Sequence, residues 1–423
     1  MLEELGEAFG KGSSKPSAHV EACLERIEQR EPEICAWVEV DREGALAAAA
    51  ESDRRWREGV PRSPLEGMTV GVKDIIDVAG KPTSVGVDGW AMGPARCDAE
   101  IVRRLRGLGA VVLGKTVTTP FACFDPSPTR HPWRTGSSPG GSSSGSAAAV
   151  ADGHVAWALG SQTGGSIVRP AAYCGIVGFK PSFGRLPLDG VFPIASRLDH
   201  LGFLCREPGD AAVIWETLTG ERVAHLETFR AGTLEDVQGP RADSLLLELW
   251  PRVVQRCRDA GAQVAPVRLP VDWDTLLEVH GVLMAYEAAQ VHAATYAQRR
   301  LLYPPGMRRL IERGQAIARS EFDRAVARQE EWQQEMEEWW DDWGGDFLLM
   351  WSAPGTAPSH RSTTGDPLFN SPWSLLGVPT LTVPVGRAAD GMPVGLQWVG
   401  RVGADASVLG AGKWCQMRGV CCR

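Results

Sequence analysis

Two glycine-serine clusters between residues 136 and 185 constrain the fold of this chain more than any other feature. The first, GGSSSGS at residues 140–146, runs into an alanine-rich segment, which predicts a loop followed by a helix. The second, Gly164-Gly165-Ser166, follows the apolar run 154–159, which predicts a strand, a tight turn and a second short helix. Glycine beside serine lets a substrate approach the main chain, and free N–H groups in such a turn form an anion-binding concavity. A flexible linker is disfavoured, because apolar, patterned segments enclose both clusters.

These motifs resemble those of the amidase signature family. The resemblance rests on four stretches: GVKD at 71–74, PGGSSSGSAAAVADG at 139–153, ALGSQTGGSIVRPAAYCGIVGFKPSFGR at 158–185 and FNSPWSLLGVPTLTVPVG at 369–386. It thins between about 220 and 345. The resemblance implies a serine hydrolase of amide bonds, with Ser166 as the nucleophile, Ser142 as a bridging serine behind a cis peptide bond from Gly141, and Lys73 as the base. It implies neither a metal nor an organic cofactor.

Alternating helix and strand patterns predict the α/β class. We expect one large domain with a central mixed β-sheet covered by helices on both faces. Its parts are a helical layer (1–60), the signature core (61–220), a variable, helix-rich region on the substrate side (221–345) and the last part of the core (346–423). The middle region, where the resemblance thins, is the candidate for substrate selection.

The charge balance of the 423 residues restricts the partners. With 44 basic and 52 acidic residues the net charge is -8, which disfavours nucleic acid or an anionic membrane as a partner. No apolar run approaches the length of a membrane span, and the N-terminus lacks a signal pattern. Ten scattered cysteines lack the spacing of a zinc site. We expect a cytoplasmic protein acting on a small amide, with a homodimer as a candidate assembly.

Lys73 is one of only seven lysines, and it lies in the strand-like run GMTVGVKDIID. Unlike arginine, a desolvated lysine can lose its proton. To act as a base, its pKa must fall from about 10.4 towards 7 or 8 through burial and hydrogen bonds to serine hydroxyls. The competing interpretation is an ion pair with Asp74 or Asp77.

Amide hydrolysis needs an activated nucleophile, a stabilised oxyanion and a proton for the leaving nitrogen. The backbone N–H groups of Thr163, Gly164, Gly165 and Ser166 are the expected oxyanion hole, since these residues precede and include the nucleophile. Ser142 would relay the proton between Ser166 and Lys73, because a hydroxyl both donates and accepts. Ser143 and Ser144 compete for that role, although the 24-residue spacing to Ser166 favours Ser142.

Arg169, Gly141 and Ser143 are the candidate substrate-binding residues. Arg169 lies three residues after Ser166, in GGSIVRP, whereas many members of the family that the chain resembles have their arginine two residues after the serine. It could bind a substrate carboxylate bidentately, or it could form an ion pair that holds the turn. Gln162 stands where the family often has aspartate, so a helper role of that acid is in doubt.

The favoured function is hydrolysis of a carboxylic amide, at a carbon-nitrogen bond other than a peptide bond, to carboxylate and ammonia through a serine acyl-enzyme. The alternative within the family is a glutamine-hydrolysing amidotransferase A-type subunit. A catalytically silent scaffold is a third possibility. A histidine triad using His131, His154 or His200 lacks a nucleophile elbow.

Residues 109–116, GAVVLGKT, satisfy the phosphate-loop pattern and suggest a nucleotide-binding protein. A phosphate loop requires a strand before it and a helix after it. Here a helix is expected before the motif and a strand within it, so nucleotide binding is disfavoured and Lys115 is expected to be structural.

Overall fold

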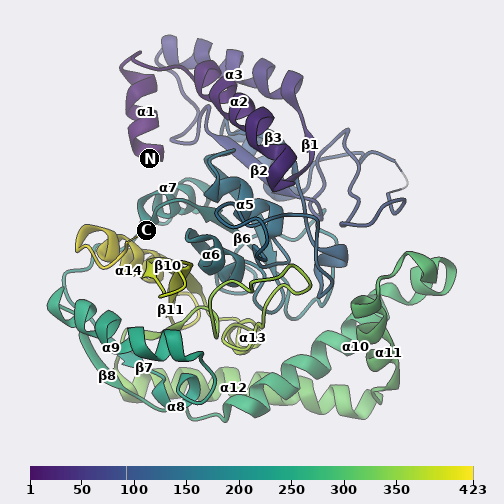
Figure 1. Cartoon of the computed structure of the whole chain (residues 1–423), viewed down its shortest axis with the longest axis vertical. Helices are drawn as coiled ribbons and strands as arrows, with labels where there is room; N and C mark the ends of the chain where they lie inside the picture. Colours follow the sequence, from purple (N-terminus) through teal and green to yellow (C-terminus); the bar gives the residue numbers. More distant parts are fainter. Residues whose placement is uncertain (92, 423) are drawn as a thin grey trace.

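A mixed β-sheet organises the chain in the computed structural model, which describes residues 1–91 and 93–422 (Figure 1). The strands are β1 (Trp37–Val40), β2 (Thr69–Lys73), β3 (Val111–Thr116), β4 (Trp157–Gln162), β5 (Val177–Lys180), β6 (His200–Cys205), β7 (Arg230–Thr233), β8 (Gln263–Pro266), β9 (Phe347–Trp351), β10 (Thr380–Arg387) and β11 (Pro393–Val399). These 11 strands follow the order β1-β3-β2-β4-β6-β5-β10-β11-β9-β7-β8. β2 is parallel to both β3 and β4, whereas the pairs from β4 to β9 are antiparallel. The predicted α/β class with a mixed sheet is confirmed.

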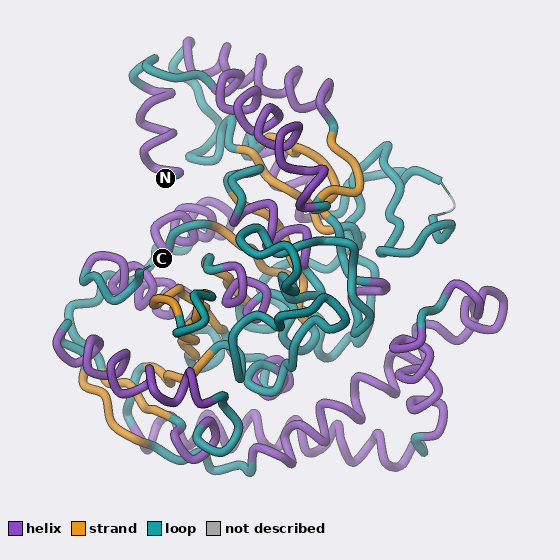
Figure 2. Tube along the Cα trace, in the orientation of Figure 1, coloured by secondary structure: helices purple, strands orange, loops and turns teal. Residues whose placement is uncertain are grey.

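Helices lie on both sides of this sheet (Figure 2). They are α1 (Leu2–Gly10), α2 (Pro16–Ile34), α3 (Arg42–Arg57), α4 (Glu100–Gly107), α5 (Ser144–Ala151), α6 (Val168–Cys174), α7 (Pro208–Thr219), α8 (Glu235–Gln238), α9 (Ser244–Asp259), α10 (Trp273–Arg299), α11 (Pro305–Ala316), α12 (Arg319–Trp343), α13 (Ser371–Leu375) and α14 (Asp405–Met417). No helix in the described part of the chain combines the length and the apolar character that crossing a membrane requires.

The central strands are buried on both faces, because alternate side chains of a strand point in opposite directions. In β4, Ala158 joins a core with residues of α2, α3, α5 and α6. Its neighbours Trp157 and Leu159 join a larger core on the other face, with residues of α4, α7 and α14. Two apolar layers therefore enclose the strands whose ends carry the predicted site residues.

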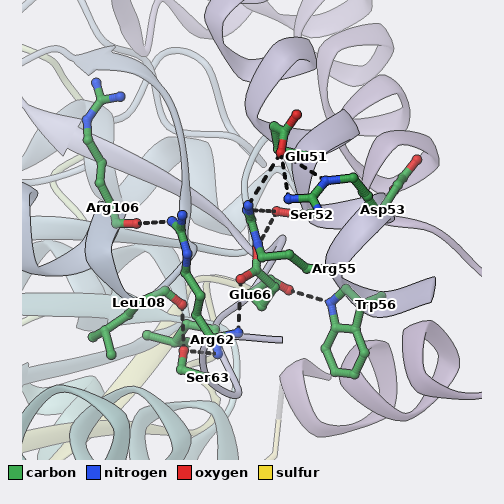
Figure 3. A network of polar contacts seen from close by, with 12 residues as sticks. Glu51, Ser52, Asp53, Arg55, Trp56, Arg62, Ser63, Glu66, Arg106 and Leu108 are labelled. Carbon is green, nitrogen blue, oxygen red and sulfur yellow. Dashed lines mark hydrogen bonds and ion pairs between the residues drawn. The ribbon is translucent and has the colours of Figure 1, made fainter. Parts of the chain in front are cut away.

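A polar network around Glu66 attaches α3 to the segment that leads into β2 (Figure 3). The Glu66 carboxylate accepts hydrogen bonds from Arg55 Nη2 at 2.8 Å and from the Arg62 backbone N–H at 3.1 Å. Trp56 Nε1 donates to the Glu66 carbonyl at 3.1 Å. Since Glu66 is fully buried, these donors compensate the loss of its hydration. The outer helix thus packs against the core through satisfied polar contacts as well as apolar ones.

The region between 221 and 345 contributes both to the sheet and to a helical arm. β7 and β8 pair with each other, and β7 pairs with β9. Helices α10, α11 and α12 then extend from this end of the sheet (Figure 1). α10 packs along both α11 and α12. This arm brings residues from the region of thin resemblance towards the glycine-serine clusters.

Most predicted elements are found within a few residues of their expected positions, including helices in the layer 1–60, a strand in the run that contains Lys73 and the helices that follow both clusters. Four strands were not predicted: β1, β5, β6 and β7. Each is short, and β5 and β6 are buried along their whole length. Short apolar runs without alternation do not distinguish a strand from a buried helix.

Candidate active site

The side chains of Lys73, Ser142 and Ser161 meet at one edge of the sheet. Lys73 ends β2 and Ser161 is near the end of β4, and these two strands are parallel neighbours. Their carboxyl ends therefore face the same side, where α/β sheets commonly bind ligands. Lys73 Nζ donates to Ser142 Oγ at 2.7 Å and to Ser161 Oγ at 2.8 Å. The sequence predicted the contact with Ser142, but Ser161 was missed.

Lys73 is fully buried and has no carboxylate partner within ion-pair distance among the described residues. Burial lowers its pKa to about 7. The competing interpretation, an ion pair with Asp74 or Asp77, is wrong. Asp74 Oδ1 lies 2.9 Å from Lys115 Nζ, and Asp77 Oδ1 accepts a hydrogen bond from Thr83 Oγ1 at 2.6 Å. The amine is left with hydroxyl groups, which do not hold it in the charged form as a carboxylate would.

The three consecutive serines in and after the loop before α5 have different hydrogen-bond partners. The bond between Gly141 and Ser142 is cis, as the resemblance implied. Ser143 Oγ lies 3.3 Å from both the backbone nitrogen and the carbonyl oxygen of Ser161, and Ser144 Oγ lies 2.8 Å from Ser127 Oγ. Of the three serines, only Ser142 contacts Lys73.

Ser166 lies in the turn between β4 and α6 and lines a cavity. Its own carbonyl accepts a hydrogen bond from the Ser143 backbone at 3.3 Å. No hydrogen bond joins the Ser166 and Ser142 side chains in this structure, and catalytic hydrogen bonds often tighten only when substrate is bound. Within the described chain, the N–H groups of Gly164, Gly165 and Ser166 have no acceptor. The turn therefore presents unpaired donors beside the Ser166 hydroxyl.

Side chains from distant elements fix this turn. Thr163 Oγ1 donates to Asp199 Oδ1 at 2.6 Å, and His280 Nε2 from α10 donates to the Thr163 carbonyl at 2.9 Å. Burial lowers the pKa of His280 to about 4, so its ring is neutral. A Cβ atom at Gly165 would lie 2.5 Å from Asn370 Oδ1, so only glycine fits there. Neither Asp199, His280 nor Asn370 was singled out from the sequence.

Gln162 has a structural contact at the start of α6. Its Oε1 accepts hydrogen bonds from the backbone N–H groups of Ile167 at 2.9 Å and Val168 at 3.1 Å. Its Nε2 donates to Ser374 Oγ at 3.2 Å. The amide oxygen thus satisfies N–H groups that a helix start leaves unpaired, without the charge of the aspartate that the family often has here.

The cavity has a volume of about 210 Å³. It is lined by the predicted oxyanion residues, by Arg169, by residues of α10 and α11 and by the segments 122–124 and 364–371: Ala122, Cys123, Phe124, Thr163, Gly164, Gly165, Ser166, Arg169, His280, Gly281, Met284, Leu310, Arg313, Thr364, Gly365, Pro367 and Ser371. Gly141 and Ser143 are not among the lining residues. Instead, the Gly141 carbonyl accepts a hydrogen bond from Arg169 Nη2 at 2.8 Å.

Arg169 is buried at the wall of this cavity, with only 4% of the residue exposed. Nη2 also donates to Thr364 Oγ1 at 3.3 Å, whereas Nε and Nη1 have no hydrogen-bond partner among the described residues. Arg169 makes no ion pair within that part of the chain, so the predicted alternative, an ion pair that holds the turn, is not found. Burial lowers the pKa of Arg169, but a guanidinium remains charged in proteins.

The phosphate-loop pattern at 109–116 is not a loop. Residues 111–116 form β3, and a Cβ atom at Gly109 would lie 2.3 Å from the Glu66 carboxylate. Lys115 is fully buried and paired with Asp74. An anionic side chain and a paired strand therefore occupy the space that phosphates would need.

The three histidines considered for a triad are buried away from the cavity. His131 contacts the Tyr173 carbonyl at 2.9 Å, His154 accepts from Trp37 Nε1 at 3.1 Å, and His200 contacts the Leu198 carbonyl at 2.6 Å. In the described chain, no group of three or more His, Cys, Asp and Glu side chains is placed to hold a metal ion.

The chain is thus an α/β protein with a buried lysine-serine cluster beside a glycine-rich turn. The Amidase family model matches residues 18–409, and the chain belongs to the amidase family, whose sequence motifs are the amidase signature. It is 33% identical over 470 residues to the A-type subunit of the glutamyl-tRNA(Gln) amidotransferase of Anaeromyxobacter sp. (strain K), covering 97% of this chain and 94% of that protein. A crystal structure of an amidase superposes with a TM-score of 0.91 at 33% identity over 99% of both chains. The native peptide amidase from Stenotrophomonas maltophilia superposes with a TM-score of 0.85 at 28% identity, over 100% of this chain and 97% of its own.

Proposed function

We propose that this protein is an amidase that hydrolyses a carboxylic amide to a carboxylate and ammonia, with Ser166 as nucleophile, Ser142 as relay and Lys73 as base. The main support for the proposal is that the buried Lys73 amine is hydrogen-bonded to the hydroxyls of Ser142 and Ser161 and not paired with a carboxylate. With its pKa lowered to about 7 by burial, a large fraction of Lys73 is neutral at physiological pH. A general base works best when its pKa lies near the operating pH.

In the first half-reaction, neutral Lys73 accepts the proton of Ser142 while Ser142 takes the proton of Ser166. Ser166 Oγ forms a bond to the amide carbon, and the carbonyl π electrons move to oxygen. The oxyanion collapses, the carbon–nitrogen bond breaks, and the proton returns through Ser142 to the leaving nitrogen, which departs as ammonia. The product of this step is an ester between the acyl group and Ser166.

In the second half-reaction, a water molecule takes the place of ammonia and gives its proton to the same relay. Its oxygen attacks the ester carbon, and collapse releases the carboxylic acid and restores the Ser166 hydroxyl. In both steps the oxyanion would accept hydrogen bonds from N–H groups of residues 163–166. Such preorganised donors contribute strongly, since removing one typically lowers the rate about 10²- to 10³-fold.

The second candidate is the glutamine-hydrolysing A-type subunit of an amidotransferase. The similarity to that component of glutamyl-tRNA(Gln) amidotransferase over nearly the whole chain favours it. In that case the same residues would release ammonia from glutamine, and the ammonia would pass to a tRNA-bound substrate through partner subunits. A cytoplasmic location suits either function and stays a prediction.

The test is ammonia release from simple amides and from glutamine by the purified chain alone. Turnover of simple amides without partners is expected of an amidase, whereas activity confined to glutamine would favour the amidotransferase role. In a parallel experiment, a fluorophosphonate probe should label the wild type and fail to label Ser166→Ala. Ser144→Ala is the matched control, because Ser144 is bound to Ser127 away from Lys73. Undiminished labelling of Ser166→Ala would overturn the assignment of the nucleophile.

A further inference from the structure

The guanidinium of Arg169 is a buried charge in the wall of the cavity and is only partly hydrogen-bonded. Two of its nitrogens, Nε and Nη1, have no hydrogen-bond partner among the described residues. Water cannot easily replace that partner, because only 4% of the residue is exposed. Burying a charge without an ion pair is unfavourable, and buried polar groups are nearly always hydrogen-bonded. Because Arg169 lines the cavity that contains Ser166, its missing partner belongs in the substrate position.

We propose that the cavity binds amides whose acyl part carries a carboxylate, and that this carboxylate accepts hydrogen bonds from Nε or Nη1 of Arg169. The inference rests on the proposed amidase function. Nη2 is already held by the Gly141 carbonyl and Thr364 Oγ1, so a symmetric fork through both terminal nitrogens is not available. These two contacts orient the guanidinium, which leaves the other N–H groups free for a charge-assisted hydrogen bond.

The other groups around the cavity favour a simple anion. Arg313 of α11 also lines it, is exposed, and forms no ion pair within the described chain. His280 is neutral because burial lowers its pKa to about 4. None of the described lining residues is an aspartate or glutamate, and the nearby Asp366 is exposed. The cavity thus attracts an anion but offers no carboxylate for the ammonium group of glutamine.

The geometry limits the length of the substrate. The Arg169 backbone N–H donates to the Gly165 carbonyl at 3.0 Å, which closes a helical turn. Side chains three residues apart on such a turn are neighbours, with Cβ atoms about 5–6 Å apart, so Ser166 and Arg169 face the same space. The cavity of about 210 Å³ is below the roughly 300–1,000 Å³ of sites for drug-sized ligands. The class that fits is the monoamide of a short dicarboxylic acid.

The test compares succinamate with butyramide, a neutral amide of the same chain length. The wild type should have the higher kcat/KM for succinamate. Arg169→Met should lower kcat/KM for succinamate about 10- to 100-fold more than for butyramide, mainly through KM, because one charge-assisted contact is lost. Arg313→Met should act in the same direction and less, since its side chain is exposed. Arg268→Met, on a side chain 88% exposed, is the surface control.

Equal losses for the two substrates in Arg169→Met, or a wild-type preference for butyramide, would overturn the inference. Should Arg169→Met fail to fold, protection supplies the test: succinate should slow fluorophosphonate labelling of the wild type, and less so of Arg313→Met. If the wild type is labelled and hydrolyses butyramide but succinate has no effect on labelling, the proposed substrate class is overturned. The proposed amidase function would then still hold. If the wild type showed no labelling and no turnover of either amide, the proposed function itself would be overturned. Faster turnover of glutamine than of succinamate would overturn the inference in favour of the amidotransferase role.

Discussion

Lys73 and Lys115 lie on neighbouring parallel strands and are equally buried, yet their surroundings differ. Lys115 pairs in register with Val72, next to Lys73, so the two lysines project to opposite faces of the sheet. Lys115 Nζ lies 2.9 Å from the buried Asp74 carboxylate and also donates to Thr83 Oγ1 at 3.1 Å. Lys73 has only hydroxyl acceptors. The partner of a buried lysine, more than its burial, therefore decides whether it is a structural cation or a candidate base.

Each lysine also belongs to a motif that contains glycine. Lys115 is the seventh residue of GAVVLGKT, whose second glycine, Gly114, lies within β3. Lys73 lies two residues after Gly71 and donates a hydrogen bond to Ser142 in the loop before α5. Asp74, the residue after Lys73, is neutralised by Lys115 and is therefore not available to Lys73. The ion pair of Lys115 with Asp74 on one face of the sheet thus keeps the Asp74 carboxylate away from the Lys73 amine on the other face.

The largest expected effect is on activity, from Lys73→Met. Methionine removes the amine and keeps a chain of similar length, so kcat should fall about 10⁴-fold or more, as for other members of catalytic triads. The free energy of unfolding should not decrease, because a desolvated amine without a counter-ion is removed. Ammonia release and urea unfolding measure the two quantities. A variant that keeps more than a tenth of the wild-type kcat would show that Lys73 is not the base.

Lys115→Met should show the opposite pattern, with a large loss of stability and a small loss of kcat. It leaves the buried Asp74 carboxylate without its partner, and breaking one side of a buried ion pair typically costs about 3–5 kcal/mol. The urea midpoint should fall accordingly, with kcat per folded molecule changed far less than in Lys73→Met. The double variant Asp74→Leu with Lys115→Met should recover much of the stability. An unchanged midpoint together with lost activity would mean that Lys115, too, acts in catalysis.

The difference between the two lysines could be predicted in part from the sequence. The order of elements, a helix before Gly109 and a strand through Val111, sufficed to disfavour a phosphate loop, because that loop needs the opposite order. The motifs containing Lys73, Ser142 and Ser166 predicted a common site, and the contact of Lys73 with Ser142 is confirmed. The catalytic roles of all three remain predictions.

Other parts of the site could not be predicted, because they depend on packing between distant segments. Ser161 lies in a strand whose alternation does not reveal which hydroxyl meets an amine. His280 and Arg313 come from α10 and α11, where the resemblance thins, and they reach the cavity only through the path of the helical arm. Asp199 contacts Thr163 across 36 residues of sequence. No local spacing encodes such contacts.

The pH dependence of activity tests whether Lys73, unlike Lys115, acts as a neutral base. With a pKa of about 7, lowered by burial from the ordinary lysine value, Lys73 is protonated and inactive below pH 7 and neutral above it. We expect kcat/KM for butyramide to rise about tenfold per pH unit below 7 and to level off above it. A lysine paired with a carboxylate would place this limb at higher pH, because the opposite charge favours the protonated amine.

Asp199 is the necessary control for this limb, because burial raises its pKa to about 6. Its negative charge also favours protonated Lys73, so Asp199→Asn should move the limb to lower pH without removing it. A pH profile between 5 and 9 separates the cases. Loss of the limb in Asp199→Asn would assign the titration to Asp199 and not to Lys73.

The smallest expected effect comes from Ser161→Ala. Lys73 would lose one of its two hydroxyl acceptors, and a hydrogen bond of this kind contributes about 1 kcal/mol, which is roughly a fivefold change in kcat. A hydroxyl that accepts a hydrogen bond from the Lys73 amine favours the charged form, so burial and not the serine hydroxyls lowers the pKa of Lys73, contrary to the expectation from the sequence. Loss of the Ser161 hydroxyl should therefore move the acid limb of the pH profile slightly lower. Ser161→Thr, which keeps the hydroxyl, should retain most of the activity. A loss as large as that of Lys73→Met would instead place Ser161 in the path of the proton, and the two hydroxyls on Lys73 would then share the relay that we assign to Ser142.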